Sequence, residues 1–175
     1  MALQAQCNLP NILYGKGCFL IDCRLLHVPI ESSNYQLTVM DNEKIKAEVI
    51  QAEENLLNLL RQGELLNGVA IHLNSPDYRN IWNGEIKTYS MLENRIKAGI
   101  EKGLKSFDYQ VQERAFLLIN AANVLETFTA IETDYMKDGS SMTSGLTAIS
   151  ILWQLVDNEW RLAYLHASEL PKENE

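Results

Sequence analysis

Histidines are the side chains of this 175-residue chain best suited to moving protons, because an unperturbed imidazole has a pKa of about 6.5. His166, near the C-terminal end, is the best single candidate for acid or base chemistry. His72, within an apolar run, is the second candidate. The alternative for both is structural, because histidines at strand ends or in half-buried strands are commonly fixed by hydrogen bonds.

Seven further side chains are candidates to contact a small molecule. They combine aromatic, aliphatic and hydroxyl groups, which is the usual lining of a small-molecule site. The large aromatic residues among them have a second reading as core material. The ligand-binding candidates are Trp82, Tyr89, Thr129, Ile131, Ile151, Trp153 and Tyr164.

Metal binding is not expected. Cys7, Cys18, Cys23 and His27 could together supply four zinc ligands, but their spacing fits no common zinc module, so we expect reduced thiols. A second set, His72 and His166 with an acidic residue such as Glu126, has long-range and unspecific spacing. The sequence also lacks a G-x-S-x-G elbow and a glycine-rich phosphate loop, so we expect neither a metal nor another cofactor.

Charge and hydropathy limit the partners. A formal net charge of −8 disfavours non-specific binding to nucleic acid or to an anionic membrane. No apolar run approaches the roughly 20 residues that span a bilayer. The short apolar run 17–21 is interrupted by Asp22 and Arg24, which argues against a targeting segment. We therefore expect a cytoplasmic protein.

The chain has two unequal parts. Residues 1–40 lack periodicity and hold every cysteine, so they are an extension of uncertain structure, and Met40 is a possible start of the protein. Residues 41–170 are regularly patterned and form the predicted domain, and residues 171–175 form a tail. Asp41 is the expected N-cap of a helix over 41–62, whose apolar residues recur every three or four positions.

After this helix we expect strands over 68–73, 78–82 and 85–88, with Asn83-Gly84 as a tight hairpin turn. Ser90 is the expected cap of a second helix. Strands then follow over 107–114, 115–119, 124–136, 145–156 and 160–168, the first two separate or continuous. This order predicts an α+β fold in which a strongly curved antiparallel sheet wraps around N-terminal helices as a cone.

Strand alternation divides the sheet residues into two faces. Three sets are expected to point into the cone: Trp160, Leu162, Tyr164 and His166; Thr147, Ile149, Ile151 and Trp153; and Thr127, Thr129, Ile131 and Thr133. The opposite face would then carry an apolar patch, which predicts a homodimer through the outer face of the sheet. That patch comprises Phe128, Ala130, Ala148, Leu152, Ala163 and Leu165.

The C-terminal part of the sequence resembles the nuclear-transport-factor-2-like superfamily, and within it the SnoaL-like and calcium/calmodulin-kinase-association-domain-like proteins. The resemblance rests on Asp138-Gly139, Trp153, the run 157–162 and the ending 164–168. It covers residues 41–170 and implies a cone-shaped roll with a pocket at its open end.

The sequence departs from the superfamily pattern at three places. Ile131 and Ile151 stand where the kinase association domains carry pocket arginines. The apolar stripe of the first helix has no tyrosine of the kind that the steroid isomerases use. Only residues 64–67 are available for the second helix of the superfamily.

Three functions remain open. The first is binding of a small, largely apolar molecule in the cone. The second is an isomerase, cyclase or dehydratase in which His166 or His72 moves a proton next to a carbonyl group. The third is an assembly module without catalysis.

Overall fold

A computed structural model describes residues 39–170 of the chain, with side chains from residue 41 onward. The predictions for the cysteines, for the extension 1–38 and for the tail 171–175 lie outside these residues. The elements, in chain order, are α1 (Val39–Arg61), α2 (Leu65–Ala70), β1 (Arg79–Trp82), β2 (Glu85–Lys87), α3 (Tyr89–Glu101), β3 (Leu104–Asn120), β4 (Asn123–Met136), β5 (Ser141–Val156) and β6 (Glu159–Glu169).

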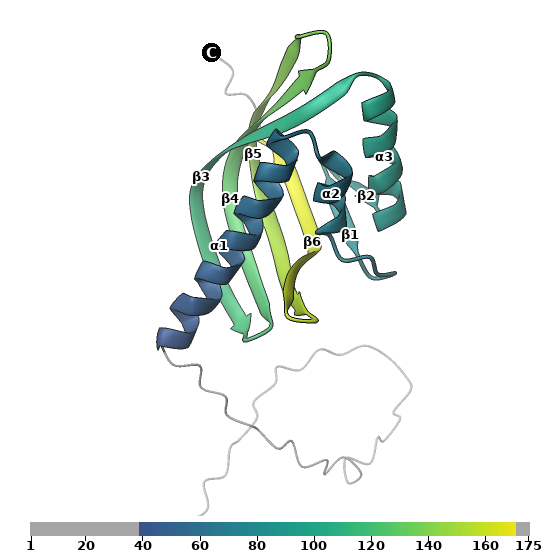
Figure 1. Cartoon of the computed structure of the whole chain (residues 1–175). Helices are drawn as coiled ribbons and strands as arrows, with labels where there is room; N and C mark the ends of the chain where they lie inside the picture. The colour runs from purple at the N-terminus through teal and green to yellow at the C-terminus, as the bar shows by residue number, and fades with distance from the viewer. Residues whose placement is uncertain (1–38, 171–175) are drawn as a thin grey trace, which may run out of the picture. The chain divides into compact units, whose positions relative to one another are not determined.

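The six strands form one sheet in the order β2-β1-β6-β5-β4-β3. β1 runs parallel to β6, and every other pairing is antiparallel. Helix α1 lies across one face of this sheet, with α2 and α3 beside it toward β1 and β2 (Figure 1). The predicted α+β cone is confirmed.

The core lies between α1 and the face of the sheet that it covers. Ile45, Val49 and Leu56 of α1 are buried, as their spacing along one stripe of the helix predicts. They pack over sheet residues that include Trp153 and Leu162, which have no exposed surface. Burial of such side chains contributes about 1.5–3 kcal/mol each, so the α1–sheet layer holds the domain together.

Helix starts were predicted less accurately than the helices themselves. α1 begins at Val39, so Asp41 lies in its first turn, where a carboxylate still favours the helix dipole. The N-cap of α3 is Thr88, whose hydroxyl accepts a hydrogen bond from the Met91 amide, and Ser90 lies inside the helix. Two neighbouring hydroxyl residues made the choice ambiguous from sequence.

The predicted strand over 68–73 is wrong. The first half of this segment, residues 68–70, belongs to the short helix α2, and of the rest only His72 makes an isolated bridge, to Leu162 of β6. An apolar run of this length suits either a strand or a buried helical turn. Gly68 favours the helix here, because it permits close approach to Leu60 of α1.

The Asn83-Gly84 hairpin formed as predicted, with positive φ at both residues (48° and 84°). Residues 107–119 lie in one continuous strand, β3, that contains a β-bulge between Gln112 and Ala115. Glu113, inside the bulge, has a φ of 48°.

Two of the three predicted inward-facing sets needed correction. In β4 the buried residues are Val124, Glu126, Phe128 and Ala130. Thr127, Thr129 and Ile131 were expected to point inward and instead point outward. Phe128 and Ala130 were expected on the outer face and instead point inward. In β6 a bulge next to Leu152 and Trp153 reverses the alternation. Trp160 and Leu162 therefore point inward as predicted, whereas Tyr164 and His166 point outward and Leu165 inward.

Candidate functional site

A pair of buried carboxyl groups lies under the middle of α1. Glu53 of α1 is 1% exposed and Glu126 of β4 is fully buried. Both occupy positions where the pattern of the element predicts an apolar residue: Glu53 follows Val49 by one helical turn, and Glu126 lies between the buried Val124 and Phe128. A charged side chain at a core position is rarely buried without a partner. A glutamate at an expected core position is therefore a signal that could have identified this pair from the sequence.

Arg114 of β3 supplies the partner for both carboxyl groups. Its Nη2 lies 2.5 Å from Glu53 Oε2, and its Nε lies 3.1 Å from Glu126 Oε1. The bulge at Glu113 places two β3 residues opposite one β4 residue, which changes the alternation of the strand. Arg114 thus reaches the inner face together with Phe116, although Val111, three residues before Arg114, also packs there.

Trp153 of β5 binds the oxygen of Glu126 that does not contact Arg114. Its indole Nε1 donates a hydrogen bond of 2.8 Å to Glu126 Oε2. Both oxygens of Glu53 and Oε1 of Glu126 nevertheless lack an aligned hydrogen bond, the contacts with Arg114 being ion pairs by distance only. A proton held between the two carboxyl groups would provide a hydrogen bond for one oxygen of each group.

The electrostatics agree with a shared proton. Burial and, to a smaller extent, the neighbouring Glu53 raise the pKa of Glu126 to about 7, against the lowering effects of the Trp153 indole and Arg114. Burial also raises the pKa of Glu53, against the lowering effect of Arg114. Two adjacent carboxyl groups cannot both ionise easily, so near pH 7 the pair titrates as a unit.

Arg114 connects this pair to a surface groove of about 310 Å³ between α1 and β3. The groove is lined by Glu54, Leu57, Asn58, Arg61, Tyr109, Val111 and Arg114. The side chain of Arg114 is 26% exposed, whereas the two carboxyl groups behind it are buried. A molecule in the groove would therefore meet Arg114 before either glutamate.

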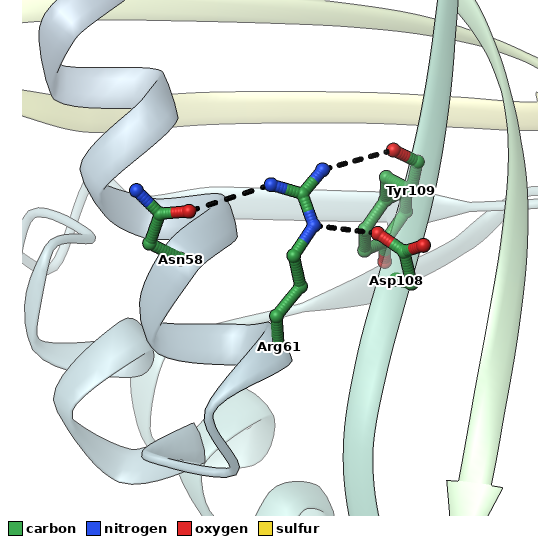
Figure 2. Close-up of polar contacts among 4 residues, drawn as sticks. All are labelled: Asn58, Arg61, Asp108 and Tyr109. Atoms are coloured by element: carbon green, nitrogen blue, oxygen red, sulfur yellow. Dashed lines mark hydrogen bonds and ion pairs between the residues drawn. The ribbon is translucent and has the colours of Figure 1, made fainter.

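Arg61 forms the rim of the groove (Figure 2). It reaches from α1 to β3, where its Nε lies 2.6 Å from Asp108 Oδ1 and its Nη2 donates to the Tyr109 carbonyl at 3.5 Å. Its Nη1 donates to Asn58 Oδ1 at 3.4 Å. These contacts fix one end of the groove.

Tyr109, which lines the groove, also contacts a further acidic residue, Glu132. Its hydroxyl hydrogen-bonds Glu132 of β4, and burial raises the pKa of Glu132 to about 7, with Asp134 adding to the increase. Asp134 Oδ1 is buried without a hydrogen-bond partner in the described part of the chain. Two residues of the groove, Arg114 and Tyr109, thus each contact a carboxyl group with a raised pKa.

The structure separates the residues predicted from sequence. Ile151 and Trp153 are buried on the inner face, and Trp82 packs against the core. Thr129, Ile131 and Tyr164 lie on the outer face, as does the exposed His166, because of the exchanged faces and the β6 bulge. Whether any of these residues contacts a ligand stays a prediction.

His72 and Tyr89 are brought together in a second pocket of about 300 Å³ beside the β5–β6 turn. No group of three or more histidine, cysteine, aspartate or glutamate side chains in residues 41–170 is placed to hold a metal ion. His72, His166 and Glu126, the alternative metal set, are distributed over this pocket, the outer face and the core.

Comparison with known proteins defines the class of fold. The sequence matches no protein-family model and no curated protein. Solved structures do match: a nuclear-transport-factor-2-like superfamily protein from Salmonella enterica superposes with a TM-score of 0.63 at 15% identity, covering 76% of this chain and 96% of that one. The chain therefore has the nuclear-transport-factor-2-like fold.

Two further structures show the range of proteins with this fold. A proposed scytalone dehydratase from Novosphingobium aromaticivorans matches with a TM-score of 0.64 at 8% identity, covering 74% of this chain and 87% of that one. A proposed calcium/calmodulin-dependent protein kinase II association domain from Xanthomonas campestris matches with a TM-score of 0.60 at 16% identity, covering 72% and 88%. At such identities the likeness concerns the fold alone.

None of the helices in residues 39–170 combines the length and apolar composition that crossing a lipid bilayer requires.

Proposed function

We propose that the chain binds a small molecule in the groove between α1 and β3, with Arg114 as the central polar contact. The observation that carries this proposal is the position of Arg114, partly exposed in the groove and paired behind with two buried carboxyl groups.

The groove favours a molecule with an apolar body and one polar group. Leu57, Val111 and the ring of Tyr109 offer apolar contact, and Arg114 and Arg61 offer hydrogen-bond donors. Four of the seven lining residues, Glu54, Asn58, Arg61 and Arg114, are charged or carry an amide, so the lining is more polar than that of a usual small-molecule site. The volume of about 310 Å³ lies at the small end of the usual range. Arg114 is the polar anchor of the proposed ligand.

A thermal-shift screen of small carbonyl, hydroxyl and carboxylate compounds tests the proposal. A compound at 100 times its dissociation constant should stabilise the folded state by about 2.7 kcal/mol. Leu57→Trp fills the groove without touching a charge and should abolish the shift. Leu66→Trp, at an exposed α2 position outside the groove, is the matched control. Shifts that survive Leu57→Trp would place the ligand elsewhere.

A second candidate function is proton transfer next to a carbonyl group, as in a dehydratase or isomerase. The carboxyl pair with a pKa near 7 favours it, because a general acid or base works best when its pKa is close to the working pH. The proposed dehydratase among the structural neighbours is in accord with this class. Here Glu126 with Glu53, rather than His166, would move the proton.

The enzyme hypothesis requires movement of Arg114, since neither carboxyl group is exposed. Its test uses a compound found in the screen. Turnover should depend on a group with an apparent pKa near 7, and Glu126→Gln should abolish turnover while binding persists. Equal turnover by wild type and Glu126→Gln would leave ligand binding alone.

The outer face of the sheet supports a homodimer, although through a different set of residues from that predicted. Residues directly opposite one another on neighbouring strands share a face. A contiguous block of outer positions on β3–β6 carries neither a carboxylate nor a lysine or arginine: Gln110, Gln112, Ala115, Leu117, Leu125, Thr127, Thr129, Ile131, Leu146, Ala148, Ser150, Leu152, Tyr164, His166 and Ser168. The charged Asp108, Glu159 and Arg161 lie beyond the ends of this block.

Such an uncharged surface on a chain of net charge −8 suits contact with a second copy of itself, because it meets no like-charge repulsion. Leu117, which is 61% exposed, lies in one row with Leu125, Leu152 and Tyr164. The association-domain neighbour is in accord with assembly. A cytoplasmic location stays a prediction.

A further inference from the structure

The second pocket contains a hydrogen-bonded chain of side chains that ends at its surface. Ala70, His72, Leu73, Asn74, Tyr89, Val156, Asp157 and Arg161 line this pocket of about 300 Å³. His72 Nδ1 lies 2.7 Å from the hydroxyl of Tyr78, which is fully buried behind it. The pocket therefore rests on a polar pair rather than on apolar side chains alone.

The orientation of the proton in this pair follows from the burial of Tyr78. The Tyr78 hydroxyl is fully buried, and His72 Nδ1 lies at hydrogen-bond distance from it, 2.7 Å away. Because a buried O–H needs an acceptor, Tyr78 donates its proton to His72 Nδ1. In a neutral imidazole the other nitrogen, Nε2, then carries the hydrogen. Asn80, which is also buried, interacts with the same Tyr78 hydroxyl.

His72 is neutral, because burial lowers the pKa of its imidazole to about 4. Within residues 41–170 no partner is present for Nε2. An N–H donor next to a pocket and without a protein acceptor is costly unless water or a ligand satisfies it.

Backbone and ring contacts hold His72 in place. Leu73 N donates to Leu162 O at 2.8 Å and Leu162 N donates to Ile71 O at 3.2 Å, so the residues on both sides of His72 are bonded to β6. The Tyr78 ring meets the His72 ring edge-on at 5.5 Å and the Tyr89 ring at 6.1 Å. A donor fixed in this way loses little conformational entropy when it binds an acceptor.

The surrounding side chains define the ligand. Arg161, which is paired with Glu159, and Asn74 add further donors, and Asp157 adds a carboxylate. Leu73, Val156 and the ring of Tyr89 add apolar surface. Arg161 is anchored by its Nη1 bond of 2.8 Å to the Ala70 carbonyl. The complementary partner is a compact molecule with an oxygen acceptor at one end and an apolar body.

We infer that this pocket binds a small molecule through a carbonyl or carboxylate oxygen, which accepts a hydrogen bond from His72 Nε2. This site is separate from the α1–β3 groove and does not depend on the function proposed for the groove. Tyr78 and Asn80 are positioning residues, because they act through His72 and do not contact the ligand.

NMR of the histidine ring nitrogens tests the first half of the inference. His72 should show the Nε2–H tautomer at pH 7. Tyr78→Phe keeps the ring but removes the hydroxyl, and should shift His72 toward a mixture of tautomers. An Nδ1–H tautomer in the wild-type chain would overturn the inference.

Titration with sodium benzoate and with benzamide tests the second half. Both carry the oxygen acceptor, and a response to benzoate alone would identify a carboxylate ligand, whereas a response to both would identify a carbonyl ligand. Saturable shifts of the His72 resonances are expected. Benzylamine has the same ring with a donor in place of the acceptor and should give none.

His72→Phe should weaken benzoate binding by roughly tenfold, the loss expected for one hydrogen bond; binding is then followed by the resonances of Leu73 and Asn74. Leu57→Trp, which fills the other groove, should leave this titration unchanged. Equal binding of benzylamine, no saturable shift with either acceptor, or full affinity in His72→Phe would each overturn the proposal.

Discussion

The side chains of Trp153 and Glu126 meet inside the sheet, where the indole Nε1 donates a hydrogen bond of 2.8 Å to Glu126 Oε2 and neither residue is exposed. Glu126 pairs with Ile151 in the β4–β5 ladder, so Trp153 is its diagonal neighbour on the same face. This contact holds one oxygen of a carboxyl group whose other oxygen is directed toward Arg114 and Glu53. The stability of the domain, its pH dependence and the proposed ligand binding are therefore all expected to depend on the Glu126 carboxyl group.

Glu126→Gln should reduce the pH dependence of stability. Burial raises the folded-state pKa of Glu126 from the ordinary 4.5 to about 7. The folded chain therefore binds more protons than the unfolded chain in this range, and stability falls as pH rises from about 4.5 to 7. The contribution is at most about 3 kcal/mol, at 1.36 kcal/mol per pKa unit.

Urea unfolding at pH 5 and pH 8 measures this effect. Glu132 has a similarly raised pKa, so part of the slope should remain in Glu126→Gln and disappear in the double variant with Glu132→Gln. Glu43→Gln, at an exposed position of α1, is the control. An unchanged difference between the two pH values in Glu126→Gln would show that Glu126 does not carry a proton near neutral pH.

Arg114→Met should destabilise the domain more at pH 8 than at pH 5. Removing one partner of a buried ion pair leaves an uncompensated charge, which costs roughly 3–5 kcal/mol when fully buried, and about 2–3 kcal/mol is expected here because Arg114 is 26% exposed. At pH 5 Glu126 is protonated, so less buried charge is left without a partner and the loss is smaller.

A double-mutant cycle checks that the loss belongs to this pair. Arg114→Met combined with Glu126→Gln should be more stable at pH 8 than the sum of the two single changes indicates. Additive free energies of unfolding would mean that Arg114 and Glu126 do not interact.

Gly63→Ala should destabilise the domain more than Gly84→Ala. Both glycines have positive φ, 79° and 84°, so an alanine is strained at either position. A Cβ on Gly63 would lie 2.7 Å from the Lys105 carbonyl oxygen, whereas a Cβ on Gly84 meets nothing within 4 Å. We expect about 1 kcal/mol at Gly84 and at least about 2 kcal/mol more at Gly63, measured by thermal and urea unfolding. Equal losses would show that the chain relaxes at the α1–α2 connection.

Leu117→Lys should convert the proposed homodimer to a monomer. Leu117 lies on the uncharged outer face and is 61% exposed in the single chain, so a lysine there adds like charges across the contact without altering the core. Leu66→Lys, at an exposed α2 position, is the matched control and should remain dimeric. Light scattering after size exclusion gives the mass directly. A monomeric wild-type chain at micromolar concentration would remove the dimer.

Several elements followed from the sequence because their causes are local. The helical spacing of Ile45, Val49 and Leu56 defined α1, and Asn83-Gly84 defined a hairpin turn. The segment that became α2 is the contrary case: its apolar run is short, and packing of Gly68 against Leu60 selected the helix. Local propensity is weak over six residues, and tertiary contact decides.

The candidate site depends on strand orientation and on β-bulges, which the sequence pattern does not reveal. Alternation along β4 separates two faces but does not say which one is buried, because Phe128 and Ile131 are both apolar. A single bulge in β6 moved His166 from the predicted pocket to the outer face, and another in β3 accompanies Arg114 on the inner face. A one-residue insertion reverses every side chain beyond it.

The sequence by itself determined the class of fold, the long helix, the hairpin and the order of helices and strands from β1 onward, since these follow from periodicity and turn chemistry within a few residues. Only the tertiary structure decided that Glu53, Arg114 and Glu126 meet, although they lie on three different elements. The physical reason is that strand register and bulges, which arise from pairing between distant segments, set the direction of each side chain and therefore the chemistry that the domain presents.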